Sequence, residues 1–94
     1  MKVIMDLTIT CKTPAGSHVD CILRKEYETS VIPAPSMYFE DPAWKEPKEC
    51  SYITCNFEEE YYHLQFPAVE IQGEEYCKRE EEMYRSHGWK GPHE

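Results

Sequence analysis

Four of the chain's seven prolines fall within residues 31–49, and this stretch limits what the 94 residues can fold into. Repeated proline excludes a helix interior and a central strand, because proline lacks the backbone donor and fixes φ. The regular elements must therefore lie before and after it. The stretch also carries large apolar side chains, which a flexible linker does not need: Met37, Tyr38, Phe39 and Trp44. We expect the long loop 33–49 to be either a lid folded onto the core or a recognition surface.

Residues 2–12 and 18–29 alternate between apolar and polar side chains, a pattern typical of half-buried strands. Between them, Pro14 suits the first corner of a turn, and Gly16 suits the left-handed residue of a three-residue hairpin loop. The sequence therefore predicts a β-hairpin at the N-terminus.

The predicted turn also sets the register of the two strands. It places Cys11 opposite Val19 and Ile9 opposite Cys21, all four on the core face. The two cysteines then lie on a diagonal of roughly 7–8 Å, which is too long for an unstrained disulfide.

A second hairpin is predicted after the loop. Residues 50–57 and 61–66 form its strands, residues 58–60 form its turn, and Phe57 lies on the inward face with Ile53 and Cys55. Pro67 ends regular pairing, and the chain extends beyond it through Val69 and Ile71.

The last predicted element is a helix over residues 73–87. Glutamates in its first turn and Arg85 in its last turn suit the helix dipole. Its apolar stripe consists of Tyr76, Cys77, Met83 and Tyr84. Gly88 suits the left-handed position after the helix, which would let Trp89 cover Tyr84.

Together these elements predict one α+β domain over residues 1–89. It consists of a four-stranded antiparallel sheet made from two hairpins, the long Pro-rich loop 33–49 and one C-terminal helix. Residues 90–94 are predicted to form a frayed tail.

The net charge of −8 is unevenly distributed. Residues 1–39 are balanced, so the whole acidic excess lies in residues 40–94, with glutamate runs at 58–60 and 80–82. This balance argues against direct nucleic-acid binding, which needs a basic face. The runs are either solvated surface or a negative face for a basic partner.

The N-terminal sequence and the cysteines bear on the same question, the compartment of the protein. The N-terminus lacks the features of a signal peptide, so we expect a cytoplasmic protein with five reduced cysteines, of which Cys50 or Cys77 is the more accessible. No apolar run is long enough to span a membrane.

No catalytic or metal-binding motif is present. The Cys50–Cys55 spacing is unlike a zinc knuckle, although a composite site of Cys55, His63 and Cys77 stays open. The chain has no glycine-rich phosphate loop and no signature of a nucleophile with an oriented base. We therefore expect no enzyme activity, no metal and no cofactor.

These features predict a small acidic protein-interaction module, an inhibitor or adaptor that presents a negative face to the basic, nucleic-acid-binding surface of a partner protein. The predicted contact residues are Glu58, Glu59, Glu60, Glu81, Glu82, Tyr38, Phe39 and Trp44. Viral and mobile-element proteins such as anti-restriction and anti-CRISPR proteins are similar in size and charge, a similarity of profile and not of motif. Two alternatives are a cysteine/histidine metal-stabilised structural module and an accessory subunit of an enzyme.

Overall fold

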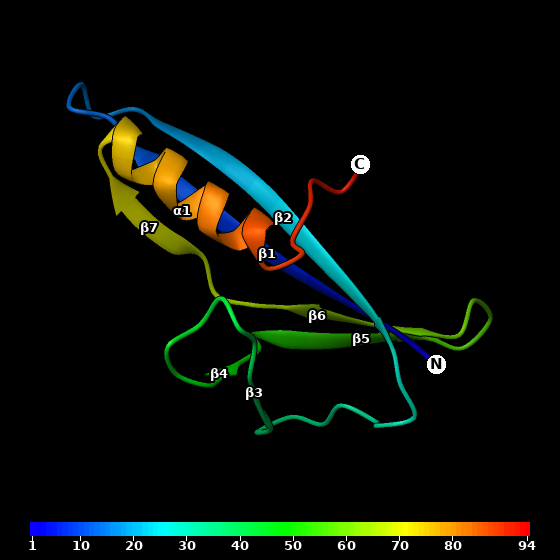
Figure 1. The fold of residues 1–94 in the computed structure, drawn as a ribbon. Coiled ribbons are helices and arrows are strands. Elements are labelled where there is room, and N and C mark those ends of the chain that lie inside the picture. The colour runs from blue at the N-terminus through cyan, green and yellow to red at the C-terminus, as the bar shows by residue number, and fades with distance from the viewer.

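The computed structural model describes all residues 1–94 and shows an α+β domain with a five-stranded mixed sheet and one C-terminal helix (Figure 1). The elements in chain order are β1 (Lys2–Lys12), β2 (His18–Glu28), β3 (Tyr38–Phe39), β4 (Lys48–Glu49), β5 (Tyr52–Asn56), β6 (Tyr61–Gln65), β7 (Val69–Gln72) and α1 (Glu74–Ser86). The short strands β3 and β4 pair with each other inside the Pro-rich loop. The helix has neither the length nor the apolar composition needed to cross a bilayer.

The N-terminal hairpin is confirmed, including its register. Strands β1 and β2 pair over eleven residues, with Cys11 opposite Val19 and Ile9 opposite Cys21. The turn closes through a hydrogen bond from the Thr13 amide to the Ser17 carbonyl, and Gly16 takes a left-handed φ of 84°. The turn residues thus direct the pairing, as expected for a three-residue hairpin loop.

The prediction of a simple four-stranded antiparallel sheet is wrong. The second hairpin docks through β6, which runs parallel to the first half of β1, and β7 runs parallel to the second half. Strand β1 is long enough to pair with both strands. Pro67 separates β6 from β7, which would otherwise be one continuous strand. Parallel pairing requires a long crossover connection, and the Pro-rich loop between β2 and β5 supplies it.

One face of the sheet carries the core, and two separate covers share it. The core residues of β1 are Val3, Met5, Leu7 and Ile9. Helix α1 covers the second half of β1, and the Pro-rich loop lies over the first half (Figure 1).

The two covers meet at a cluster of aromatic rings. Trp44 from the loop lies 4.9 Å from Phe66 and 5.8 Å from Trp89, measured between ring centroids, and its indole N–H donates to the Tyr84 hydroxyl at 3.0 Å. Trp89 follows the helix and turns back at Gly88, whose φ is 94°, to pack edge-on against Tyr84. The predicted contact between Trp89 and Tyr84 is thereby confirmed.

The carboxylate of Asp41 lies beneath this junction and is fully buried. One oxygen accepts from the Lys25 ammonium at 2.8 Å and from the Tyr27 hydroxyl at 3.2 Å. The other accepts from the Ala43 amide at 2.9 Å and the Trp89 indole at 3.0 Å. Asp41 therefore joins strand β2, the loop and the segment after the helix.

A disulfide between Cys11 and Cys77 contradicts the expectation of five free cysteines. It joins the end of β1 to the first turn of α1, with Cα atoms 5.9 Å apart. Cys77 is buried, although Cys50 or Cys77 was expected to be the more accessible cysteine. Ile71 of β7 pairs with Cys11, and the helix starts two residues after β7 ends. Because the helix then returns over the core face, Cys77 reaches Cys11.

The C-terminal tail does not fray at Lys90. The backbone of Lys90 pairs with that of Arg24 on the outer edge of β2, through two hydrogen bonds of 2.6 and 2.9 Å. Further along, the Glu94 carboxylate accepts from Arg85 at 2.8 Å. The tail therefore protects part of an exposed strand edge.

The disulfide makes a direct prediction. Alkylation of the denatured, unreduced protein should modify three cysteines, and Cys11→Ser should lower the free energy of unfolding by about 3 kcal/mol, since the bond closes a long loop. Intact mass and urea denaturation measure the two effects. Cys50→Ser is the matched control and should keep both the bond and most of the stability. Five alkylated cysteines without reductant would contradict the bond.

The Asp41 contacts make a second prediction. Asp41→Asn should lower the free energy of unfolding by about 3 kcal/mol, because the buried Lys25 ammonium loses its counter-charge and an amide N–H faces two donors. Asp20→Asn, at an exposed position of β2, should change it by less than about 0.5 kcal/mol. Urea denaturation followed by tryptophan fluorescence compares them. Equal, small effects would show that Asp41 does not hold the covers together.

Candidate functional site

The acidic run Glu58–Glu60 forms the turn between β5 and β6, at one extremity of the molecule (Figure 1). All three side chains are exposed, and none takes part in an ion pair within the chain. The Asn56 side chain accepts a hydrogen bond from the Glu59 amide at 2.9 Å, and Glu60 takes a left-handed φ of 57°. The turn therefore has a defined backbone conformation and an unneutralised negative charge.

Phe57 lies at the start of the same turn and is 85% exposed, the most of any large apolar residue in the chain. The expectation that it points inward is wrong. Strand β5 ends at Asn56, whose partner is Tyr61, so Phe57 lies beyond the last paired position. Asn56 carried the available signal, because asparagine favours turns over strands. We call residues Phe57–Glu60 the acidic turn.

The second acidic run does not adjoin the acidic turn. Glu81 and Glu82 lie on α1, which Figure 1 places well away from the β5–β6 turn. Glu81 is engaged within the chain, since it pairs with Arg85 at 2.9 Å and accepts from the Cys21 thiol at 3.2 Å. The hydrogen bond from Arg85 holds the pKa of Glu81 below its usual range. Only Glu82 of these two is exposed and unpaired.

The predicted contact aromatics divide between the core and the surface. Phe39 packs edge-on against Phe66, with centroids 5.7 Å apart, and Trp44 lies in the aromatic junction. Tyr38 points outward and is 65% exposed. The loop thus acts as a lid through Phe39 and Trp44, and Tyr38 alone is free to meet a partner.

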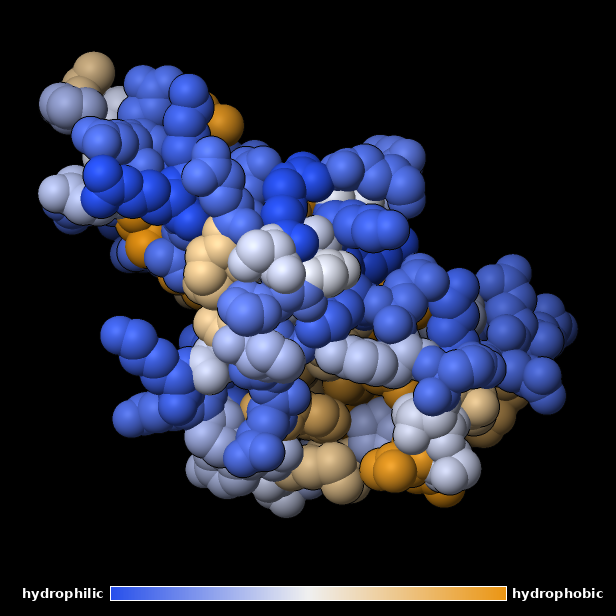
Figure 2. Space-filling model, in the orientation of Figure 1, coloured by the Kyte–Doolittle hydropathy of each residue, from blue (hydrophilic) through white to orange (hydrophobic).

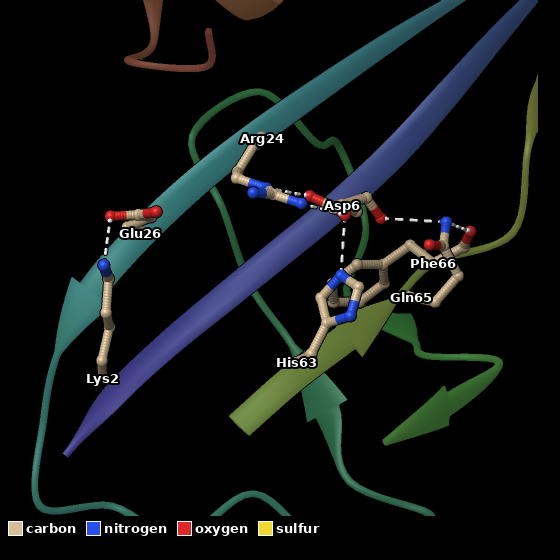
Figure 3. A network of polar contacts seen from close by, with 7 residues as sticks. All are labelled: Lys2, Asp6, Arg24, Glu26, His63, Gln65 and Phe66. Carbon is tan, nitrogen blue, oxygen red and sulfur yellow. Dashed lines mark hydrogen bonds and ion pairs between the residues drawn. The ribbon is translucent and has the colours of Figure 1, made fainter. Parts of the chain in front are cut away.

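A network of polar side chains lies on the sheet face opposite the core, and sequence reasoning did not find it (Figure 3). Asp6 of β1 accepts from Arg24 of β2 through both carboxylate oxygens, at 2.7 and 2.9 Å. His63 of β6 lies 2.7 Å from the same carboxylate. The signal was available in the register, because Asp6 faces Arg24 in the predicted hairpin. Burial alone raises the pKa of Asp6, but the hydrogen bonds from Arg24 and His63 outweigh it and lower this pKa.

This network joins three strands, and we call its residues Asp6, Arg24 and His63 the polar clamp. His63 makes its side-chain hydrogen bond to Asp6, and no hydroxyl or thiol lies within hydrogen-bond distance of its ring. A general base needs such a contact to activate a nucleophile. The arrangement therefore orients Arg24 and His63 on the sheet without pairing them to a nucleophile.

The cysteines and histidines do not converge on a common point. Cys77 is bonded to Cys11, and no three side chains of His, Cys, Asp and Glu gather in a metal-binding arrangement. Burial, together with Glu81, raises the pKa of the Cys21 thiol to about 11, so it stays protonated at neutral pH. The composite site of Cys55, His63 and Cys77, which the sequence left open, is not assembled.

Comparison of the chain with protein-family models, with curated proteins and with solved structures finds no match.

The lowered pKa values of Asp6 and Asp41 predict a loss of stability in acid. Because each carboxyl binds its proton less readily in the folded chain, its contribution is complete above the unfolded pKa of about 4 and is lost as the pH falls through the lower folded pKa. Urea denaturation should show the free energy of unfolding declining below about pH 4. Asp6→Asn should show a shallower decline, and Asp20→Asn the same slope as the parent. Identical slopes in all three proteins would contradict the role of Asp6.

Proposed function

We propose that the protein is a binding module that docks its acidic turn onto a Lys/Arg-rich surface of a partner protein, where it acts as an inhibitor or adaptor. The observation that carries this proposal is Phe57, a large ring 85% exposed at the tip of a hairpin and followed by three unpaired glutamates. Interfaces commonly combine aromatic anchors with a polar rim, and Phe57 with the glutamates beside it has this composition. A ring left in water in this position has no role in the core.

The negative charge of the acidic turn favours a partner with a positively charged surface. Glu58, Glu59 and Glu60 have no ion pair within the chain, whereas Glu26 of β2 is paired with Lys2 at 3.1 Å. An unpaired run of like charge attracts an oppositely charged surface and steers its approach. Direct contact with a nucleic-acid backbone would be repulsive, so the partner is a protein with a basic surface, such as the one with which nucleic-acid enzymes hold phosphates.

The rigidity of the acidic turn supports the same proposal. The hydrogen bond from Glu59 to Asn56 and the pairing of Asn56 with Tyr61 hold the turn before any partner arrives. A preorganised loop loses less conformational entropy on binding than a flexible one. A small domain that covers a basic surface in this way inhibits or recruits without chemistry of its own.

The test compares two triple variants with the same net charge. The first replaces Glu58, Glu59 and Glu60 with Gln, and the second replaces three scattered exposed acids, as Asp20→Asn, Glu46→Gln and Glu74→Gln. Immobilised parent protein should retain from a native-host lysate a basic protein, to be identified by mass spectrometry. The purified partner should then bind the turn variant at least tenfold more weakly in surface plasmon resonance and the scattered variant almost normally.

Phe57→Ser supplies the second arm of this test. It should reduce affinity at least tenfold with no change in folding, because the ring is exposed in the free protein and buried only in the complex. Tyr52→Ser removes another exposed ring, from β5, and should leave the affinity unchanged. The proposal fails if the purified partner binds both triple variants equally, or if no basic protein is retained.

A further inference from the structure

A second exposed apolar region lies where the segment after β2 crosses the first half of β1. It contains a groove of about 320 Å3. The apolar part of the lining consists of Val3, Met5, Tyr27, Val31, Pro33, Phe39 and Leu64. Figure 2 shows orange and tan surface in the lower part of the molecule, where Figure 1 places this segment. We call this region the apolar groove.

The groove is formed before any ligand binds. The backbones of Met1 and Thr29 exchange two hydrogen bonds, of 2.9 and 3.0 Å, and the Val31 amide donates to the Thr29 hydroxyl at 3.1 Å. On the other walls, Tyr27 is tied to Asp41 and Phe39 is packed on Phe66. Hydrogen bonds and packing therefore hold each wall in place.

The groove has apolar surface that the fold itself does not cover. Val31 is 62% exposed and Tyr27 is 42% exposed along its walls, whereas the core residues Met5 and Leu64 beneath them are almost fully covered. Exposed apolar surface that is contiguous marks a contact site, because a partner that covers this surface removes it from water, which is favourable. The open volume is near the lower limit of ligand pockets, which suits one large side chain.

The charged residues that line the groove indicate the charge of the peptide residues on either side of that side chain. Glu28 and Glu40 line it, and no Lys, Arg or His does. Glu28 approaches only the N-terminal ammonium, at 3.8 Å, and Glu40 has no ion pair. A second copy of this chain is disfavoured as the occupant, because its exposed Phe57 is followed by three glutamates that Glu28 and Glu40 would repel.

We propose that the apolar groove binds a large apolar side chain of a partner peptide whose neighbouring residues are Lys or Arg, with Glu28 and Glu40 meeting the cations. The exposed side chains of Val31 and Tyr27 supply the apolar contact, and the two carboxylates supply the preference for a basic segment. This site is separate from the acidic turn, and the proposal does not depend on the partner of that turn.

The probe is a capped pentapeptide with phenylalanine at its centre and lysine at the other four positions. Added to the protein, it should shift the methyl NMR signals of Met5 and Leu64 with a Kd of about 1 mM, as expected for one anchored side chain. The same peptide with central alanine should bind at least tenfold more weakly, because the apolar burial is lost. The peptide with glutamate in place of lysine should cause no shift.

Two neighbouring residues provide a matched pair of variants. Val31→Gln should weaken binding of the lysine–phenylalanine peptide about fivefold, whereas Ile32→Gln should leave it unchanged, since Ile32 is 67% exposed but lies outside the groove. The double variant Glu28→Gln, Glu40→Gln should weaken binding and reduce its salt dependence. Phe57→Ser should bind the peptide like the parent, which separates this test from that of the acidic turn.

Three results would overturn the proposal. The first is that the Met5 and Leu64 signals do not move. The second is equal binding of the phenylalanine and alanine peptides. The third is equal loss of binding in Val31→Gln and Ile32→Gln, which would place the peptide elsewhere on the exposed segment.

Discussion

The buried carboxylate of Asp41 is the contact on which the arrangement of the two covers depends. It accepts hydrogen bonds from β2, from its own loop and from Trp89 after the helix, so three segments distant in sequence meet at one charged group. Burial alone would raise the pKa of Asp41, but the contacts with Lys25, the Ala43 amide and Trp89 outweigh burial and keep the carboxyl ionised. A buried charge is tolerated only when all its hydrogen-bonding positions are filled. Because partners of Asp41 come from the loop and from the segment after the helix, a shift of either cover would leave the carboxylate with a missing partner.

The length of β1 explains why two covers are needed. This strand has β6 and β7 beside its two halves, and neither the helix nor the Pro-rich loop extends over both. The polar clamp of Asp6, Arg24 and His63 joins β2, β1 and β6 on the opposite face. The sheet is thus held by aromatic packing on one side and by charge on the other. The apolar groove lies near the end of β2, where Tyr27 and Val31 are exposed beside the covered core.

The two proposed contact regions share a negative charge and differ in shape. The acidic turn presents an outward ring and unpaired glutamates, and the apolar groove is a hollow with glutamates in its lining. We propose a basic partner for each, in agreement with the surplus of acids in the chain. They differ in shape, so the turn is proposed to enter a partner's surface and the groove to receive a partner's side chain. One partner could engage both regions, which would raise its effective concentration at the second after the first has bound.

Local patterns determined the N-terminal hairpin, its register, the helix and the contact of Trp89 with Tyr84, because alternation, turn residues and helix-end glycine act over a few neighbouring positions. They left the Pro-rich loop open between a lid and a recognition surface, and the packing of Phe39 and Trp44 on Phe66 decides for a lid at these two residues. The parallel docking of β6 and β7, the Cys11–Cys77 bond and the Asp41 contacts involve residues far apart in the chain. Whether the second hairpin docks on the free edge of β1 or on that of β2 depends on the summed burial of both covers, and no local pattern carries that sum. Phe57 is an intermediate case, because alternation predicts an inward ring while the preceding Asn56 favours a turn. Strand pairing ends at Asn56 in the tertiary structure, and this decided that the ring faces water.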